Sequence, residues 1–250
     1  IHFCAFSTTS QGQLPQNLYY TSTVTAAIGG TQYMYVTGGY AAVSTVYKAT
    51  IDASGNVGTF ATTSQGQLPA IRERHDVITA SVGGTQYVYV IGGNTASTVY
   101  KATIDGSGNV GAFSTTSQGQ LPQALNGLST TTTTSGGTQY VYVLGGRNSG
   151  STTVSTVYKA TIDSSGNIGV FSTTSQAQLP QVLETFPTFS ATVGGTQYLY
   201  PITGWNVSAQ STVYKATIGP DTGGTPTSTV YSIATAGDQI TTSSWDHLDS

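Results

Sequence analysis

Hydrophobic and polar side chains alternate along several short segments of this chain. In residues 86–91, Tyr87 and Tyr89 point to one face of an extended segment and the two valines beside them point to the other. Residues 97–104 alternate in the same way, and no segment carries a convincing helical period. The pattern predicts short β-strands joined by turns, and therefore an all-β fold.

These segments belong to a repeat that the chain contains four times. The sequence GGTQY begins at residues 29, 83, 136 and 194, and STVYKATI begins at 44, 97, 155 and 211. A third block, SQGQLP or SQAQLP, begins at 10, 64, 117 and 175. Spacing within the repeat is constant except between the second glycine pair and STVY, so length varies in a single loop per repeat.

Each repeat is expected to form four antiparallel strands, which we name A to D. In the second repeat these are residues 75–82, 86–91, 97–104 and 109–116, with a tight turn, DGSGN, between C and D. Four such strands in a repeat of roughly 50 residues are typical of a β-propeller blade.

The run YVYVIGG…STVYKATIDGSGNVGAFSTTSQGQLP resembles the kelch repeat: a strand ending in Gly-Gly, a short loop and a tyrosine-bearing strand. The resemblance covers nearly all of residues 1–218 and implies a propeller of kelch-like blades. Two departures leave the activity open. Phe60, Phe113 and Phe171 stand where kelch repeats often have tryptophan, and only the second repeat has the arginine and histidine that often follow the Leu-Pro turn.

We predict one propeller domain over residues 1–235 and a C-terminal tail over 236–250. The blades are expected at about 16–63, 70–116, 123–174 and 181–218, the last completed by residues 1–10. Residues 3–10 match strand D of the repeat, so they are expected to pair with strand C of the fourth repeat and close a four-bladed ring. Alternatively, residues 228–235 supply that strand, and the propeller is larger or built from several chains.

A binding site is expected on the face that carries the B–C loops, which vary in length, and the D–A loops, which vary in identity. Aromatic and charged residues gather in these loops. The candidate ligand-binding residues are Asn17, Tyr19, Tyr20, Arg72, Glu73, Arg74, His75, Asn126, Arg147, Glu184 and Trp205.

Residues 72–76, RERHD, form the one charge cluster of the sequence. Its arginines are suited to clamp a carboxylate or sulfate. The alternative is structural, with the arginine and histidine bonded to backbone carbonyls of the adjacent blade. The D-x-S-G-N turns lack the distal glutamate of a calcium loop, so they are interpreted as hairpin turns.

The amino-acid composition argues against several classes of binding partner and site. Only 7% of the 250 residues are charged and the net charge is −3, without a basic run, which argues against nucleic acid. The single cysteine, Cys4, excludes an intrachain disulfide and a cysteine zinc site. No apolar run reaches the length of a membrane span, and no signal peptide is expected. No metal or cofactor is expected, and the hydroxyl-rich composition suits an extracellular or cell-surface protein.

The chain has three histidines and no recognisable catalytic constellation. We therefore expect a non-enzymatic extracellular or surface module that recognises a glycan or a protein, and a homo-oligomer or larger assembly fits the same composition. One alternative is an enzyme that resembles kelch sugar mutarotases or epimerases, with Glu73 or Glu184 and Arg74 or His75 as its acid and base. Another is a structural component of a surface fibre.

Overall fold

The computed structural model describes residues 8–40, 43–174, 176–206 and 208–219. Within these ranges every regular element is a β-strand, which agrees with the predicted all-β class. None of the described segments forms a helix of the length and apolarity that a membrane span requires.

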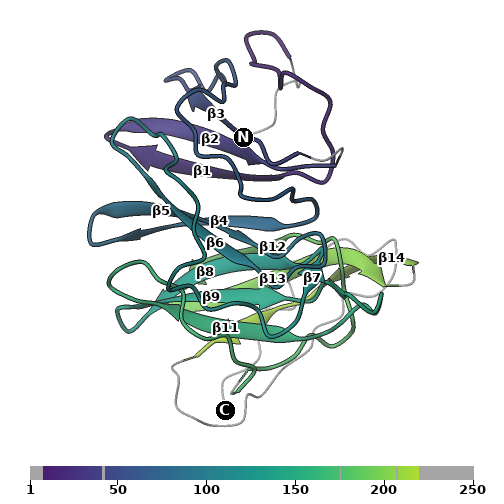
Figure 1. Cartoon of the computed structure of the whole chain (residues 1–250). Helices are drawn as coiled ribbons and strands as arrows, with labels where there is room; N and C mark the ends of the chain where they lie inside the picture. The colour runs from purple at the N-terminus through teal and green to yellow at the C-terminus, as the bar shows by residue number, and fades with distance from the viewer. Residues whose placement is uncertain (1–7, 41–42, 175, 207, 220–250) are drawn as a thin grey trace, which may run out of the picture.

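Each repeat forms one antiparallel sheet, and we number these repeat sheets from one to four (Figure 1). The first contains β1 (Ser22–Ile28), β2 (Thr31–Thr37) and β3 (Val46–Ile51), and the second contains β4 (Asp76–Val82), β5 (Thr85–Ile91) and β6 (Val99–Ile104). The third contains β8 (Ser129–Ser135), β9 (Thr138–Leu144) and β11 (Val157–Ile162). The fourth contains β12 (Thr188–Val193), β13 (Thr196–Asn206), β14 (Ser208–Val213) and β15 (Ala216–Ile218). A separate ladder joins β7 (Leu125–Asn126) to β10 (Arg147–Asn148).

The predicted strands A, B and C are present in each repeat, but strand D is not a regular strand. In the second repeat this segment meets strand C only at two isolated bridges, Ile104 with Val110 and Lys101 with Ser114. Two residues of β6 lie between the two bridges, whereas three residues lie between them on the outer segment. The extra residue is a bulge that interrupts the ladder, and the first and third repeats have it at the same place. The prediction of four regular strands per sheet is therefore wrong for these repeats.

The sheets stack face to face because both of their faces are apolar. In each second strand the tyrosines point to one side, here called the tyrosine face, and the alternating aliphatic residues to the other, here called the valine face. Tyr35 of the first sheet packs in one cluster with Val88 of the second. Tyr89 of the second sheet packs with Val141 of the third, and Tyr142 of the third packs with Leu199 of the fourth. The core is thus a series of equivalent sheet-to-sheet interfaces.

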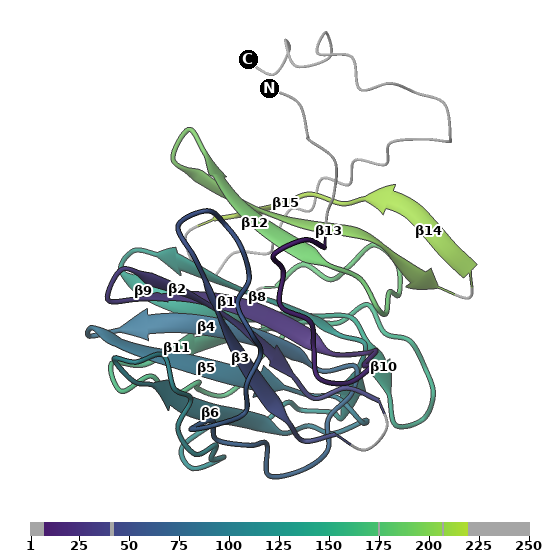
Figure 2. The ribbon, with the colours of Figure 1, turned by 90° about the horizontal axis from the view of Figure 1, so that it is seen from above.

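The first strands of the repeats gather at the centre of the molecule. The strands β1, β4, β8 and β12 contact one another in this order. Figure 1 shows the first sheet at one end of the stack, and Figure 2 shows the fourth sheet to one side of it, where β12 contacts β8 of the third sheet. The chain enters each of these inner strands from the loop that follows its Leu-Pro pair, so equivalent loop residues meet around one mouth.

The fourth repeat departs from the others at Pro201. β13 runs through this proline and has a register irregularity between Ile202 and Gly204, where Thr203 has a φ of 57°. The strand then continues to Trp205 and Asn206 and pairs with β14. The segment WNVSAQ, predicted as a loop, therefore belongs mostly to a hairpin extension, because the bulge redirects the strand beyond the sheet.

The predicted closure by residues 1–10 lies largely outside the described residues. From residue 8 onwards the chain follows the repeat. The Gln11 side chain donates to Asn56 and accepts from the Val57 amide. Gln65 bonds to Asn109 and Val110 in the same way. Residues 8–13 thus contact the turn of the first sheet in the same way that residues 62–67 contact the turn of the second.

Candidate active site at the mouth of the inner strands

Four equivalent residues before the inner strands adopt left-handed backbone conformations. Tyr20, Arg74, Gly127 and Thr185 have φ values of 59°, 52°, 60° and 55°. Three of the four are not glycine, and a side chain in this region costs about 1–2 kcal/mol. The repeat of such an unfavourable geometry indicates that the surrounding structure holds the mouth in a fixed shape.

These residues are joined by backbone hydrogen bonds that run from sheet to sheet, which we call the mouth ladder. The Arg74 amide donates to the Tyr20 carbonyl at 3.0 Å, and the Gly127 amide donates to the Arg74 carbonyl at 2.7 Å. The Thr185 amide donates to the Gly127 carbonyl at 2.6 Å. The ladder fixes the spacing of the side chains beside it.

Tyr19, Glu73, Asn126 and Glu184 each precede one residue of the mouth ladder. Three of these four side chains have a buried oxygen without a hydrogen-bond partner among the described residues: Glu73 Oε2, Asn126 Oδ1 and Glu184 Oε2. Buried polar atoms are ordinarily paired with protein or water, so three such acceptors in one row are available to a bound group or to water. Two of the three are carboxylates, which can also transfer protons.

The B–C loops hold these residues from the other side. The Glu73 amide donates to Asn94 Oδ1 at 2.8 Å, and the Asn94 amide donates to the Glu73 carbonyl at 3.1 Å. Glu184 and Trp205 exchange backbone hydrogen bonds of 3.0 and 2.9 Å. Asn126 pairs with Arg147 in the ladder of β7 and β10. Backbone contacts therefore fix each acidic or amide residue of the mouth before any ligand binds.

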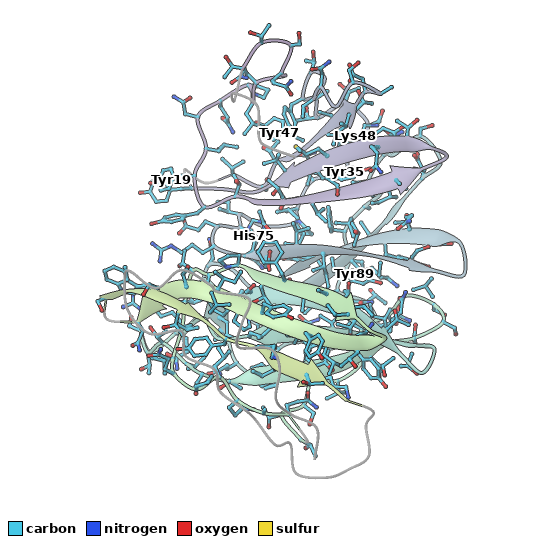
Figure 3. The ribbon with its side chains drawn as sticks, turned by 180° about the vertical axis from the view of Figure 1, so that it is seen from behind. Tyr19, Tyr35, Tyr47, Lys48, His75 and Tyr89 are labelled. Carbon is cyan, nitrogen blue, oxygen red and sulfur yellow. The ribbon has the colours of Figure 1, made fainter. Side chains whose placement is uncertain are left out.

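Exposed aromatic rings flank this row at both ends. On the first repeat, Tyr19 stacks on Tyr40 with ring centroids 4.5 Å apart and lies 4.9 Å from Tyr20, and all three are exposed. Arg74 donates to the Tyr20 hydroxyl at 2.7 Å and covers its ring. Figure 3 shows Tyr19 at the end of the first sheet. On the fourth repeat the exposed ring next to Glu184 is Trp205, which bonds to Glu184 through the backbone.

Arg72 is not part of this surface. Its side chain is buried and donates to the Tyr100 hydroxyl at 3.1 Å and to the Ile71 carbonyl at 2.9 Å. In the third repeat a glutamine, Gln123, donates to the equivalent hydroxyl, and leucine takes the place of the arginine. The second repeat has Ala70 instead of that glutamine, so Arg72 supplies the missing donor.

His75 is also buried, between the first and second sheets (Figure 3). Its Nε2 lies 2.7 Å from the Thr37 hydroxyl. Burial, and to a smaller extent the Arg72 guanidinium, lower the pKa of His75 to about 3. The ring is therefore neutral near pH 7, and it contacts the glycine-lined backbone of the B–C loops rather than the mouth.

Asp76 links three sheets at the start of their inner strands. One oxygen accepts from the Ser22 hydroxyl at 2.9 Å, and the other accepts from the amide and hydroxyl of Thr130 at 2.6 and 2.8 Å. Burial raises the pKa of this carboxyl, although these donors act in the opposite direction. All of its acceptor capacity is directed at protein donors, so Asp76 has a structural role.

The remaining polar features lie away from the mouth. The carboxylate of Asp105 accepts hydrogen bonds from the amides of Asn109 and Ser107, and these bonds lower its pKa. The equivalent turn carboxylates, Asp52 and Asp163, accept the same kind of bonds, and their pKa values are lowered as well. The predicted hairpin turns are therefore present. In the described ranges no three His, Cys, Asp or Glu side chains form a group that could hold a metal ion. Asn17 is exposed on the first loop.

A neutral groove of about 350 Å³ lies at the opposite ends of the inner strands. It is lined by Thr79, Ala80, Ser81, Thr132, Thr133, Thr134, Gln139 and Gln197. This lining contains no carboxylate or imidazole.

No family model matches the chain, and no curated protein matches it. Solved structures do match. One is an exo-1,5-α-L-arabinanase from a bovine ruminal metagenomic library, with a TM-score of 0.51 and 12% identity over 88% of this chain and 85% of that one. Another is the GH43_1 enzyme of Xanthomonas citri, seen with xylotriose and with xylose. Its TM-scores are 0.51 and 0.53 at 11% and 12% identity, over 85% of this chain and 73% of that one.

This chain has a β-propeller fold. The propeller predicted from the repeats is confirmed. Its assignment to the kelch family is not evident, because the similar structures are glycoside hydrolases, whose propellers have five blades. The same finding contradicts the prediction of a non-enzymatic binding or assembly module, and with it the prediction that the chain is not an enzyme.

Several of the residues predicted from the sequence do lie together at the mouth. Tyr19, Glu73, Asn126 and Glu184 occupy the same position of the repeat, four residues after the Leu-Pro proline. Tyr40 and Asn94, which reach the mouth from B–C loops, were not predicted. The left-handed backbone of the mouth residues was not predicted, because its only sequence signal is a glycine, Gly127, at one of the four positions.

Proposed function

We propose that this propeller is a carbohydrate-active enzyme that hydrolyses glycosidic bonds at the mouth of its inner strands. The observation that carries the proposal is the pair of carboxylates, Glu73 and Glu184, each with a buried oxygen that accepts no hydrogen bond from the described part of the chain. They stand two steps apart along the mouth ladder, with Asn126 between them. A pair of carboxylates is the usual equipment for hydrolysis of a glycosidic bond.

In the proposed reaction Glu184, the more deeply buried of the two, donates a proton to the glycosidic oxygen as the bond to the anomeric carbon breaks. A water molecule adds to the anomeric carbon, and Glu73 accepts its proton. Asn126 bonds to a sugar hydroxyl between them. The products are two sugars with one proton moved from Glu184 to Glu73, and solvent restores both groups.

The aromatic rings at the two ends of the row support a carbohydrate substrate. Tyrosine and tryptophan faces stack on sugar rings, and here they are exposed beside the carboxylates. The similar solved structures include an arabinanase and an enzyme seen with xylose and xylotriose, which makes neutral pentose glycans the first substrates to test. A hydroxyl-rich protein that cleaves such glycans suits a location outside the cell or on its surface.

We further propose that each repeat sheet is one blade and that the chain contributes four blades. The repeated inner strands and the three equivalent sheet interfaces support this number.

Incubation with linear arabino- and xylo-oligosaccharides, followed by chromatography of the products, tests the proposed activity. Shortened oligosaccharides are the expected result, and proton NMR of the first products assigns the anomeric outcome. One contrary result is faster interconversion of sugar anomers without cleavage of the glycosidic bond. The other is no effect on the oligosaccharides at all. Either result would overturn the proposed hydrolysis.

A further inference from the structure

Consecutive repeat sheets meet through one interface that the described chain builds three times. The tyrosine face of each sheet packs on the valine face of the next. At the first boundary the Tyr35 hydroxyl donates to the Gly108 carbonyl at 2.8 Å, and at the second the Tyr89 hydroxyl donates to the Gly166 carbonyl at 2.7 Å. Both carbonyls belong to the D-x-S-G-N turn of the following sheet.

The fourth sheet presents a tyrosine face that no described sheet covers. On its inner strand Phe189 is 58% exposed, whereas Ile78, its equivalent in the second sheet, is 7% exposed. Val193, two places further along the same face, is 61% exposed. The hydroxyl of Tyr200, the equivalent of Tyr89, has no hydrogen bond to any part of the chain that the structure describes.

The first sheet presents the complementary half. On its valine face Thr23 is exposed, whereas its equivalents Val77 and Thr130 are buried at 5% and 7% exposure. The turn that ends this sheet is also open. A Cβ atom at Gly108 would lie 2.7 Å from the Tyr33 ring of the preceding sheet, whereas one at Gly55 would meet no described atom within 4 Å.

We propose that the tyrosine face of the fourth sheet binds the valine face of the first sheet in a second copy of this chain. The two faces are the unmatched halves of an interface that this sequence forms three times internally. A second copy supplies the exposed inner-strand part of the valine face, at Thr23 and Thr25, and the turn carbonyl for the Tyr200 hydroxyl. The outer part of that face is already buried within one chain, where Val36 and Ala49 pack in one cluster with Leu14 and Leu18. Because few charges lie on either face, the contact depends on apolar burial and on this hydrogen bond.

Such a contact joins two different surfaces, so it is heterologous. Each copy keeps one free half after pairing, and assembly continues until a ring closes. The exposed Phe189 face would remain costly in a monomer, since monomeric soluble proteins rarely expose contiguous apolar patches without a partner. The proposal does not depend on the hydrolase activity, because the mouth residues are not part of either face.

Two double variants test the two faces of the proposed interface one at a time. F189E/V193E places charge on the tyrosine face of the fourth sheet, and T23E/T25E places charge on the valine face of the first. All four side chains are exposed, so the folded chain tolerates them. V170E is the control, because Val170 is 86% exposed on the outer segment of the third repeat. Circular dichroism and thermal unfolding verify that each variant folds.

Sedimentation velocity from about 1 μM to about 1 mM covers weak and moderate interfaces. Wild type and V170E are expected to increase in mass with concentration, and each double variant is expected to stay at the mass of one chain. An equimolar mixture of the two double variants is expected to form a species of twice that mass and no larger one, because only one intact interface remains. Monomeric wild type, association of F189E/V193E alone, or a mixture that stays monomeric would each overturn the proposal.

Discussion

The hydroxyl of Tyr89 donates a hydrogen bond of 2.7 Å to the carbonyl of Gly166, across the boundary between the second and third sheets. Burial raises the pKa of this phenol far above its usual range, so the hydroxyl remains a donor at all ordinary pH values. The hydrogen bond therefore fixes the turn of the third sheet in one position against the second sheet. This contact links the strand sequence of one repeat to the turn sequence of the next.

Substitution Y89F is expected to reduce the free energy of unfolding by about 1–2 kcal/mol, because it leaves a buried carbonyl without its donor. Urea unfolding measures the change. Y200F is the matched control at a protein concentration where the chain is a monomer, since the equivalent hydroxyl on the fourth sheet has no bond within the described residues of one chain. Equal losses in the two variants would show that the interface bond is not the cause.

Substitution R72L should destabilise the protein, although leucine occupies this position in the other three repeats. The leucine would fill the space but leave the buried Tyr100 hydroxyl unpaired, at a cost of about 1–3 kcal/mol. The double variant A70Q/R72L restores the arrangement in which Gln123 serves Tyr158, and we expect it to recover most of that loss. Thermal unfolding of the two variants and wild type completes the test. A double variant less stable than R72L would contradict this assignment.

The neutral, buried His75 makes stability depend on pH. Its pKa is about 3 in the folded protein and about 6.5 in the unfolded chain, so the unfolded state binds more protons between these values. The free energy of unfolding should therefore fall as pH drops below 6.5, by at most about 1.4 kcal/mol per pH unit from this residue.

Substitution H75Q keeps a partner for the Thr37 hydroxyl and removes the titration. Urea midpoints measured from pH 7 to pH 4 should then decline less steeply than in wild type. The raised pKa of Asp76 acts in the opposite direction, but it is present in both proteins and cancels in the comparison. Parallel pH profiles would show that His75 titrates normally.

The exposed ring of Trp205 should act in substrate binding and not in the chemical step. W205A is expected to raise KM about fivefold with kcat unchanged, the loss of roughly 1 kcal/mol of stacking. The backbone bonds between Trp205 and Glu184 do not require the ring, so the carboxylate should stay in place. Steady-state kinetics on the best oligosaccharide substrate decide the matter, with V170A as a distant control. A fall in kcat at constant KM would assign the ring another role.

Much of the fold could be predicted because the repeated sequence indicates where each strand begins and ends and which side chains share a face. Alternating Tyr and Val residues define two apolar faces, and the recurring Gly-Gly pairs define the ends of the second strands. The bulge in the outer segment could not be predicted, since a single additional residue in an irregular segment leaves no periodic signal. The extension of β13 beyond Pro201 was equally hidden, because a bulge redirects a strand that the proline alone would end.

The candidate site was predictable in position but not in role. Equivalent loop positions placed Glu73, Asn126 and Glu184 around one mouth, whereas sequence alone could not separate them from Arg72 and His75. That separation depends on neighbours distant in the chain, such as Tyr100 for Arg72 and Thr37 for His75. The unpaired oxygens that favour an enzyme are visible only once the packing around them is known.

The most direct measurement is the rate of oligosaccharide cleavage by wild type and by E184Q. Glutamine has the shape of glutamate but cannot donate the proton, so kcat should fall by about 10²–10⁴ while the fold, followed by circular dichroism, is unchanged. D163N, which alters a carboxylate in an exposed turn, should leave kcat at the wild-type value. An E184Q variant that cleaves the substrate as fast as wild type would contradict the assignment of the active site to this mouth.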